Sequence, residues 1–354
     1  MIECIREVQE LDSLADSWNM LAEPFETPLR RYEWSAACAR AFCPPGQLHV
    51  LVAREGKEIT ALAPLTILKR AGIETLELLG NSFLYEPGGF LYRDRESLWE
   101  LVRALRMRNM PVLLWRLSAD SEETEALRGC RDGRVLLTIR ESTGAPYLPI
   151  ETDWFGYEAT ISGHRRSSLR RALRRAEAFG RVEFEIASPR PEELPRHLEE
   201  VFHVEAAGWK GRNGTAMLSS EQMRRFFSFY AYKAARLGIL RLGAMRIDGR
   251  PAAIQVAVEY ANRFWVLKIG YDERWARCSP GVLLMRETLR YAFERGLASY
   301  EFLGIDQPWI HFWTARVRPH VSSRMYPFSF RSGLRLGIDM TEMIVNRARA
   351  RAGR

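Results

Sequence analysis

The stretch that determines the fold spans residues 239–281 and reads ILRLGAMRIDGRPAAIQVAVEYANRFWVLKIGYDERWARCSPG. It contains three runs dominated by apolar side chains, as expected for strands of a buried sheet. These runs occupy residues 239–247, 252–260 and 264–271. Asp248-Gly249 separates the first two runs and is a strong signal for a two-residue hairpin, and Ala261-Asn262 separates the next two. The stretch therefore predicts an antiparallel meander that leads into a helix.

The elements predicted around this meander follow an order that also occurs in the first half of the chain. In the second half we expect, besides the meander, a strand at 182–186, helices at 191–207, 220–237 and 281–295, a strand at 299–303, a short helical segment at 309–313 and a strand at 323–330. In the first half we expect a strand at 2–8, helices at 10–21 and 32–42, strands at 48–53, 59–68 and 73–79, a helix at 96–107, a strand at 112–117, a helix at 121–128 and a strand at 134–139. The repeat spacing of roughly 180 residues indicates duplication of one domain.

Composition favours a folded protein with two domains. A chain of 354 residues is too long for one ordinary core, and its hydrophobic content of 47% excludes global disorder. No secretory leader and no apolar run of about 18 residues is visible, so we expect a cytoplasmic protein without a transmembrane segment. The five cysteines are scattered and never spaced as CxxC, which predicts neither a disulfide framework nor a zinc site. The net charge of +8 suits an anionic partner such as a phosphorylated cofactor, nucleic acid or a membrane face.

Several short stretches, in this order along the chain, resemble one family of tandem acetyltransferases. They are Trp34 after Phe25-Glu26-Thr27-Pro28, Ala145-Pro146-Tyr147-Leu148-Pro149, the arginine-rich helix after Gly163, Trp209-Lys210, Ser279-Pro280-Gly281 and Glu301-Phe302-Leu303-Gly304. The chain is similar to the tandem-GNAT proteins of the CelD/BcsL-type or BioF2-like acetyltransferases, which are related to the FemABX peptidyltransferases. The resemblance implies an α/β (α+β) fold of two GNAT-like domains, each a mixed, mostly antiparallel sheet flanked by helices.

Under this resemblance the chain divides into four parts. We expect an N-terminal GNAT-like domain at 1–144, a linker with the arginine-rich helix at 145–180, a C-terminal GNAT domain with the acyl-CoA site at 181–332, and a basic helix or tail at 333–354. In the first half, the segment before the helix is longer, and Pro87-Gly88-Gly89 lies well ahead of the helix start. We therefore expect the N-terminal copy to be degenerate and to shape the substrate site.

The acyl-CoA site is predicted where the last meander strand leads into the next helix. A helix N-terminus binds pyrophosphate through its unpaired N–H groups and its partial positive charge. In Ser279-Pro280-Gly281, proline lacks only a backbone N–H that the helix does not need, and glycine allows a phosphate to approach the backbone closely. An ordinary Ser-Pro helix start is the alternative interpretation of these residues. GNAT enzymes typically have Arg or Gln, two residues, Gly, one residue, then Gly or Ala, and only the last position is matched here. The predicted cofactor set is Ile269, Gly270, Tyr271, Arg277, Cys278, Ser279, Pro280, Gly281 and Val282.

Acyl transfer needs a base for the acceptor, a donor for the developing oxyanion and an acid for the leaving thiolate. The resemblance implies that backbone N–H groups near residues 269–271 hold the thioester oxygen. The candidate acid–base side chains are Asp272, Glu301, His311, Lys268 and Glu205. Each also has a structural interpretation: the carboxylates suit surface or packing roles, His311 suits packing between tryptophans, and Lys268 suits an ion pair with Glu259 across the hairpin.

Two basic or aromatic features are candidates for substrate contacts. Trp209-Lys210 is predicted to close the acceptor groove, with a core-packing tryptophan as the alternative. Residues 164–181 place arginines, including Arg166 and Arg170, opposite an apolar stripe, so that face either binds an anion or is simply solvated. The arginines of residues 346–354 either touch a membrane surface or belong to a mobile tail, and we expect mobility.

The sequence favours transfer of an acyl group from acyl-CoA, without a metal, to an amine or hydroxyl of a sugar, polysaccharide or cell-envelope precursor. The resemblance connects this family with exopolysaccharide or cellulose production. One alternative is FemABX-like transfer from aminoacyl-tRNA, with RNA on the arginine face. Another is a non-catalytic binding module in an exopolysaccharide synthesis complex. No metal-ligand cluster, GxSxG motif or nucleotide fingerprint is visible in the sequence.

Overall fold

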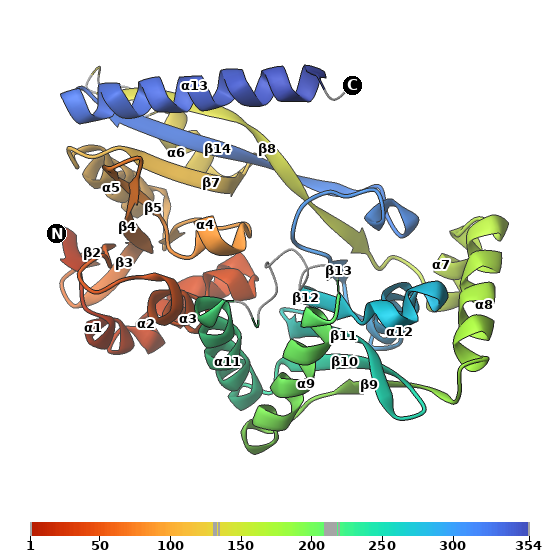
Figure 1. Cartoon of the computed structure of the whole chain (residues 1–354). Coiled ribbons are helices and arrows are strands. Elements are labelled where there is room, and N and C mark those ends of the chain that lie inside the picture. Colours follow the sequence, from red (N-terminus) through yellow and green to blue (C-terminus); the bar gives the residue numbers. More distant parts are fainter. Residues whose placement is uncertain (1, 130–132, 134, 209–217, 219, 353–354) are drawn as a thin grey trace. The chain divides into compact units, whose positions relative to one another are not determined.

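The computed structural model describes residues 2–129, 133, 135–208, 218 and 220–352, and for 342–352 only the backbone (Figure 1). The chain forms two compact units. Unit 1 contains residues 1–25, 29–143 and 319–354, and unit 2 contains residues 26–28 and 144–318. Residues 319–354, which we expected partly in the C-terminal domain and partly in a tail, therefore pack with the N-terminal part of the chain.

Unit 1 contains two sheets. Its elements are β1 (Ile2–Ile5), α1 (Val8–Asp12), α2 (Ala15–Ala22), α3 (Tyr32–Phe42), β2 (Val50–Glu55), β3 (Glu58–Ala63), β4 (Leu65–Arg70), β5 (Ile73–Leu78), α4 (Asn81–Leu84), β6 (Leu91–Tyr92), α5 (Arg95–Arg106), β7 (Val112–Ser118), α6 (Glu122–Gly129), the first part of β8 (Val135–Pro149), most of β14 (Val317–Pro327) and α13 (Phe330–Ala352). One sheet has the order β1-β2-β3-β6, and the other runs β4-β5-β7-β14. A single apolar cluster joins α5, α6 and both sheets.

Unit 2 contains the predicted meander. Its elements are the end of β8, α7 (Trp154–Thr160), α8 (Gly163–Glu177), β9 (Val182–Ala187), α9 (Leu194–Ala206), α11 (Glu221–Arg236), β10 (Leu240–Ile247), β11 (Arg250–Tyr260), β12 (Arg263–Tyr271), the 3-10 turn η5 (Glu273–Cys278), α12 (Pro280–Glu294), β13 (Ser299–Glu301) and the 3-10 turn η6 (Ile310–Phe312). The strand order is β8-β13-β12-β11-β10-β9. Asp248 and Gly249 both have positive φ, at +47° and +70°, which confirms the predicted hairpin turn.

The strand expected to complete the second half lies in unit 1. We expected 323–330 to complete the second half, but β14 pairs with β7 in unit 1 through residues 320–325. The strand expected at 134–139 forms the first part of β8 and packs on the unit 1 cluster, so it belongs to the first half as expected. β8 then continues into unit 2, where residues 147–149 pair with β13. Local periodicity does not encode which sheet a strand joins.

Three other predictions need correction. The expected strand 59–68 is split into β3 and β4 at Pro64, because proline cannot donate to a sheet ladder. The expected linker at 145–149 is strand, since β8 continues to Pro149. The C-terminal segment forms a long helix from Phe330 to Ala352 rather than a short helical piece.

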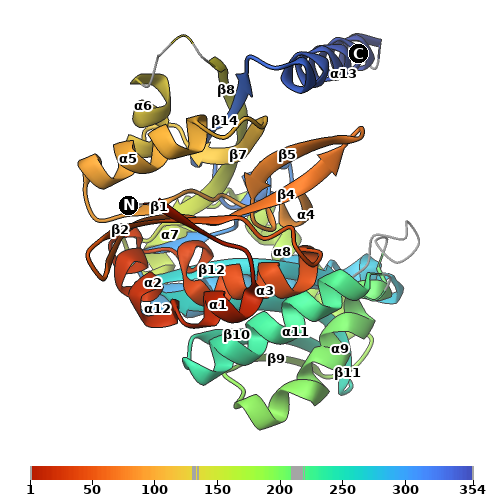
Figure 2. The ribbon, with the colours of Figure 1, turned by 90° about the vertical axis from the view of Figure 1, so that its left-hand side faces the viewer.

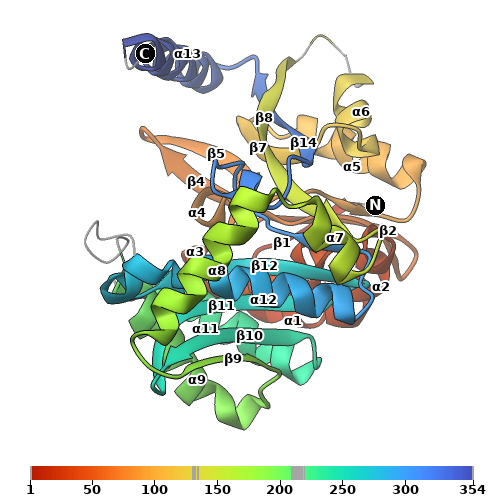
Figure 3. The ribbon, with the colours of Figure 1, turned by 90° about the vertical axis from the view of Figure 1, so that its right-hand side faces the viewer.

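Two helical layers cover the unit 2 sheet (Figures 2 and 3). On one face α9 packs against β11 and β12, with α11 beside it. On the other face α12 packs against β10, β11 and β12, and α8 packs on α12 and η5. Side chains alternate between these layers along β12, because successive residues of a strand point to opposite faces. This alternation determines which residues of β12 reach each layer.

Candidate functional site

The parallel strands β12 and β13 are paired over a short distance only. Their register joins Arg263 to Ser299 and Trp265 to Glu301, and there β13 ends. β12 continues to Tyr271 without this partner. Leu303 and Gly304, with φ of +54° and +55°, then turn the chain away from the strand direction. From Val266 onward β12 is not paired with β13, and we call this side of residues 266–271 the β12 edge.

Backbone amides alternate in direction along β12. The amide of Asp272 donates to the carbonyl of Ala252 on β11, at 2.9 Å. Because amide directions alternate along an antiparallel strand, the Tyr271 amide points away from β11, and the Ile269 amide shares its orientation. The Gly270 amide points back toward β11. Of the three predicted backbone donors, two are thus directed away from β11, toward the β12 edge.

A β-bulge precedes these donors. The β11–β12 register shifts between Val256 and Ala257, which pair with Lys268 and Val266. Leu267 is therefore the extra residue of the bulge. A bulge bends a strand and redirects the residues that follow it, and here those residues are the ones whose amides reach the edge.

Lys268 and Gly270 face α9. The Lys268 Nζ lies 3.1 Å from the Oε1 of Glu205, which is buried. A Cβ atom on Gly270 would lie 2.9 Å from the Cα of Glu205, so only glycine fits this crossing. The expected pairing of Lys268 with Glu259 is wrong, because the register places Lys268 opposite Val256.

Glu259 instead belongs to a separate ion-pair group. Its carboxylate is 3.1 Å from both Arg241 and Arg295 and accepts a 2.8 Å hydrogen bond from Tyr291. Burial opposes its ionisation, but these partners outweigh burial and lower the pKa of the Glu259 carboxyl group. The negative charge of Glu259 is thus balanced by Arg241 and Arg295 and not by Lys268.

Ile269 and Tyr271 face α12. The Tyr271 ring lies beside Gly281, where a Cβ atom would be 3.6 Å from the ring. Ile269 and Val282 pack against the apolar cluster that contains Phe302. The structure therefore brings together four predicted cofactor residues, Ile269, Tyr271, Gly281 and Val282, near the β12 edge.

The first turn of α12 has no side-chain cap. Ser279 precedes it in a left-handed conformation, with φ of +51°, and its hydroxyl caps no helix amide. Pro280 follows at the first helical position, as predicted. Cys278 points inward, donates to the carbonyl of Trp275 at 3.0 Å and is buried, which raises the pKa of its thiol. Cys278 is thus a packing residue, whereas Ser279 and Pro280 are at the helix start.

Arginines gather around this turn. Arg277 is exposed in η5, and its carbonyl accepts a 3.3 Å hydrogen bond from Arg175 of α8. This contact fixes the exposed arginines of α8 beside the start of α12 (Figure 3). A cationic surface next to an uncapped helix N-terminus is suited to bind phosphate groups.

Asp272 and Glu301 are both held by arginine. Asp272 accepts hydrogen bonds from the Arg274 amide at 2.9 Å and from its Nε at 2.8 Å. Burial opposes ionisation of Asp272, but the Arg274 hydrogen bonds outweigh it and lower the pKa of this carboxyl group. Glu301 is buried, lies 2.6 Å from the Nη2 of Arg318, and accepts from the Ser299 hydroxyl at 2.6 Å. Neither carboxylate is arranged as an accessible base.

His311 has a different setting. It lies on η6, is exposed, and its Nε2 is 2.7 Å from the Oδ1 of Asp306. Its Nδ1 has no hydrogen-bond partner among the described residues. Ile310, the preceding residue, is buried in the cluster against which Ile269 and Val282 pack. Sequence reasoning missed Asp306, whose position five residues before a candidate histidine was the available signal.

The predicted substrate-contact residues differ in what they do. Arg166 donates to the carbonyls of Glu158, Ala159 and Ile161 at 2.8–3.2 Å, so it caps the end of α7. Arg170 is exposed and forms no hydrogen bond or ion pair with another described residue. Trp209 and Lys210 lie outside the described residues.

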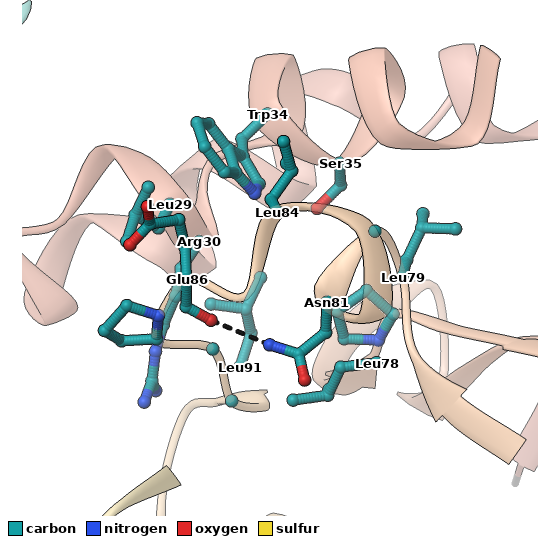
Figure 4. A pocket seen from close by; sticks show the side chains of 15 residues that line it. Leu29, Arg30, Trp34, Ser35, Leu78, Leu79, Asn81, Leu84, Glu86 and Leu91 are labelled. Carbon is teal, nitrogen blue, oxygen red and sulfur yellow. Dashed lines mark hydrogen bonds between the residues drawn. The ribbon is translucent and has the colours of Figure 1, made fainter. Parts of the chain in front are cut away.

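Unit 1 contains a counterpart of this site that is closed. β5 and β7 pair in parallel at Leu76–Val112 and Glu77–Leu113, as β12 and β13 do. The loop after β5 surrounds a cavity of about 30 Å³, room for about two water molecules (Figure 4). Inside it, Asn81 donates to the carbonyl of Glu86 at 2.7 Å, and its own Oδ1 has no partner among the described residues.

The helix that follows in unit 1 has a side-chain cap. Asp94 accepts a 2.8 Å hydrogen bond from the Ser97 amide at the start of α5. That hydrogen bond, together with those from Arg93 and the Ser97 hydroxyl, lowers the pKa of Asp94 to about 2. A carboxylate therefore already occupies the helix N-terminus that corresponds to the start of α12.

Comparison with known proteins identifies one matching domain family. Residues 163–310 match the family model described as acetyltransferase (GNAT) domain. No curated protein sequence matches the chain significantly. Among residues that the structure describes, no group of three or more His, Cys, Asp or Glu side chains is arranged for a metal ion.

Solved structures share the fold over nearly the whole chain. FemX is 12% identical, with 93% of this chain and 97% of that chain covered and a TM-score of 0.57. The C-terminal DUF2156 domain of a protein assigned as lysylphosphatidylglycerol synthetase from Agrobacterium fabrum is 12% identical, with 94% and 96% covered and a TM-score of 0.55. A conserved protein of unknown function from Bacteroides thetaiotaomicron is 8% identical, with 92% and 99% covered and a TM-score of 0.54. The chain thus has an α/β fold of two GNAT-like units, and residues 163–310 form an acetyltransferase (GNAT) domain.

Proposed function

We propose that unit 2 binds acyl-CoA along the β12 edge and transfers the acyl group to an amine or hydroxyl. One observation carries this proposal: β12 continues past the end of β13 and leads through η5 to the uncapped start of α12. This arrangement aligns an acyl-binding edge with a phosphate-binding helix start. The acetyltransferase (GNAT) family match of residues 163–310 supports the same assignment.

The residues present fit such a donor. The first turn of α12 and Arg277 would hold the pyrophosphate, since both offer positive charge. Ile269 and Val282, which pack on one apolar cluster, would line the path of the acyl arm. The Tyr271 amide, which points away from β11, would donate to the thioester oxygen as it gains negative charge. The bound thioester would supply the activated acyl group.

His311 is our choice for the general base, with Asp306 as the group that orients it. The Nε2–H donates to Asp306, which leaves Nδ1 to accept the proton of the attacking amine or hydroxyl. The acceptor atom forms the new bond to the acyl carbon, the carbon–sulfur bond breaks, and the proton on His311 passes to the leaving thiolate. Asp272 and Glu301 support the site through their arginine pairs.

The acceptor class rests on the family resemblance, which favours a sugar, polysaccharide or cell-envelope precursor. We expect unit 1 not to bind a second acyl-CoA. The small size of its cavity and the Asp94 cap support this expectation.

Calorimetric titration with acetyl-CoA tests the donor site. We expect micromolar binding by the native protein and a loss of about a hundredfold or more in Gly281→Glu, because the new carboxylate repels the pyrophosphate. Gly281→Ala is the matched control, since its Cβ would make an ordinary 3.6 Å contact with Tyr271. Equal binding by Gly281→Glu and the native protein would contradict the site.

One alternative donor is favoured by a specific observation. α8 exposes Arg165, Arg170, Arg171, Arg174 and Arg175 along one face, which suits a polyanion such as tRNA. If the native protein does not bind acetyl-CoA but binds aminoacyl-tRNA, with an affinity that falls steeply with salt, aminoacyl transfer would replace our proposal. If it binds neither ligand, the result would favour a non-catalytic module.

Activity measurements test the base. In His311→Gln we expect kcat for thiol release from acetyl-CoA, assayed with a panel of amino sugars, to fall about a hundredfold with unchanged acetyl-CoA affinity. His203→Gln, on the exposed end of α9, is the control histidine. Full activity of His311→Gln would remove His311 from the mechanism.

A further inference from the structure

Helix α8 carries more positive charge than its surroundings balance. Its 15 residues, Gly163–Glu177, contain six arginines and a single acidic residue at the last position. Two of these arginines have local roles, since Arg166 caps α7 and Arg165 donates to the carbonyl of Phe312 at 3.0 Å. The other four are all exposed: Arg170, Arg171, Arg174 and Arg175.

The four exposed arginines form two like-charged pairs. Arg170 and Arg174 are four residues apart, and so are Arg171 and Arg175, which places the members of each pair on one side of the helix. Like charges at this spacing destabilise a helix. The helix dipole favours cations in the last turn, which accounts for Arg174 and Arg175 but not for the arginines one turn earlier.

No carboxylate of the protein relieves this repulsion. None of the four arginines has an ion-pair partner in the part of the chain that the structure describes. In α12, by contrast, the exposed Arg290 pairs with Glu294 one turn away, at 2.7 Å. The residue one turn before Arg171 is Ser167, whose hydroxyl accepts from Arg171 at 3.1 Å. The positive charge of α8 is therefore available to an anion that the protein itself does not supply.

One of the two pairs lies beside the start of α12. The Nη1 of Arg175 donates to the carbonyl of Arg277 at 3.3 Å, three residues before α12 begins at Pro280. Arg171 is on the same side of α8, one turn earlier. We call Arg171 and Arg175 the α8 row.

Apolar contacts fix α8 against this helix start (Figure 3). Just after α8 ends, the Phe179 ring meets the Trp275 ring of η5 at a centroid distance of 5.5 Å. The apolar stripe of α8 is buried in one cluster with the start of α12, and this cluster includes Ala172, Ala176, Cys278, Leu283 and Leu284. The α8 row is therefore held in place by packing and does not depend on a bound ligand for its position.

The chemistry of the proposed donor identifies an anion for this row. CoA has a 3′-phosphate on the ribose that is joined directly to its pyrophosphate. A phosphate monoester has close to two negative charges at neutral pH, and arginine binds phosphate through paired hydrogen bonds. An anionic lipid surface fits less well, because the apolar stripe of α8 is already buried against α12. No helix among the described residues is long and apolar enough to cross a membrane.

We propose that Arg171 and Arg175 bind the 3′-phosphate of CoA, so that the site distinguishes CoA from dephospho-CoA. The inference rests on the donor site proposed for unit 2 and adds a second phosphate subsite to it. The first turn of α12 and Arg277 would hold the pyrophosphate, and the α8 row would hold the 3′-phosphate. The bound phosphate would also relieve the repulsion between the two arginines.

Calorimetric titration of the full chain with CoA and with dephospho-CoA tests the subsite. We expect the native protein to bind CoA about tenfold or more tightly than dephospho-CoA, and we expect added salt to reduce this preference. In the double variant Arg171→Gln and Arg175→Gln, both ligands should bind equally, with the affinity for dephospho-CoA unchanged. The unchanged affinity for dephospho-CoA also shows that the variant is folded.

The double variant Arg224→Gln and Arg236→Gln is the matched control. Both arginines are exposed on α11, on the other face of the unit 2 sheet, so their replacement removes the same charge from the same unit. The preference for CoA should stay at about tenfold or more in this control. A preference that the control variant loses as well would reflect overall charge and would overturn the assignment to the α8 row.

Gly281→Glu separates failure of this inference from failure of the donor site. It should weaken the binding of both ligands, because both contain the pyrophosphate, whereas the α8 double variant should weaken CoA binding alone. Equal binding of CoA and dephospho-CoA by the native protein would overturn the subsite and leave the donor site intact. So would a preference for CoA that persists in the α8 double variant. A native protein that binds neither ligand would overturn both proposals.

Discussion

The parallel strand pairs β5/β7 and β12/β13 occupy corresponding positions in the two units, yet their ends differ. In unit 1 the loop after β5 closes over a small cavity, and Asp94 caps the next helix. In unit 2 β12 continues to Tyr271, and the next helix starts at Pro280 without a side-chain cap. The helix start of unit 1 thus holds an internal carboxylate and that of unit 2 holds none, which is why we propose that an external anion binds in unit 2.

A buried ion pair holds the closed end in unit 1. Arg30 lies 2.6 Å from Glu123 and donates to the carbonyl of Phe90 at 2.8 Å. A Cβ atom on Gly89 would lie 2.4 Å from Arg30 and 2.6 Å from Glu123, so the pair packs directly on the loop backbone. The corresponding loop of unit 2, Asp272 to Ser279, is held instead by the exposed Arg274.

The largest effect is expected from breaking this pair. Glu123→Ala leaves Arg30 without its buried partner and should lower the free energy of unfolding by about 3–5 kcal/mol, measured by urea denaturation. Glu122→Ala, at the exposed neighbouring position, should change the free energy of unfolding by less than about 0.5 kcal/mol. A small effect of Glu123→Ala would show that the loop is held by other contacts.

An intermediate effect is expected from giving unit 2 the cap of unit 1. Ser279→Asp places a carboxylate before α12 and should weaken acetyl-CoA binding about tenfold, which corresponds to about 1.4 kcal/mol. Ser279→Asn is the matched control, since asparagine has the same shape without charge and both residues tolerate positive φ. Calorimetry measures both variants. Equal weakening of acetyl-CoA binding by Asp and Asn would indicate a steric effect and would contradict a role of charge in the difference between the units.

The smallest effect is expected from removing the cap in unit 1. Asp94→Ala should cost about 1 kcal/mol of unfolding free energy at neutral pH, and Asp94→Asn should cost little, because asparagine also caps helices. The folded pKa of Asp94 is lowered from 3.8 to about 2, so its charge stabilises the fold above about pH 4. This contribution falls as pH drops through about 2. Urea denaturation at several pH values checks the trend, which a pH-independent difference between the native protein and Asp94→Asn would contradict.

Local signals predicted much of the fold. The helix expected at 32–42 forms as Tyr32–Phe42, and Ser220 caps α11 by accepting from the Met223 amide. These features depend on side-chain periodicity and on hydrogen bonds between near neighbours, which the sequence displays directly. The candidate site was harder to predict from the sequence. The roles of Asp306 and of Glu205, the partner of Lys268, depend on contacts that turns and strand register create.

The sheet that each strand joins was not predictable from local pattern. β14 looks like a strand that closes the second copy, yet it pairs with β7, and β8 continues from unit 1 into unit 2. Such pairing depends on which sheet edge is available. The burial of Asp339 on α13 likewise becomes reasonable only when Tyr326 and Arg324 are seen beside it.

The sequence by itself determined the duplicated element order, the meander of residues 239–271 and the helix start at Ser279-Pro280-Gly281, because turn chemistry and apolar periodicity are local properties. Only the tertiary structure decided that β13 stops short of β12, that Lys268 pairs with Glu205, and that Asp339 of α13 is buried beside Arg335. Register, burial and partner choice depend on residues far apart in the chain, and their energies exist only once those residues meet.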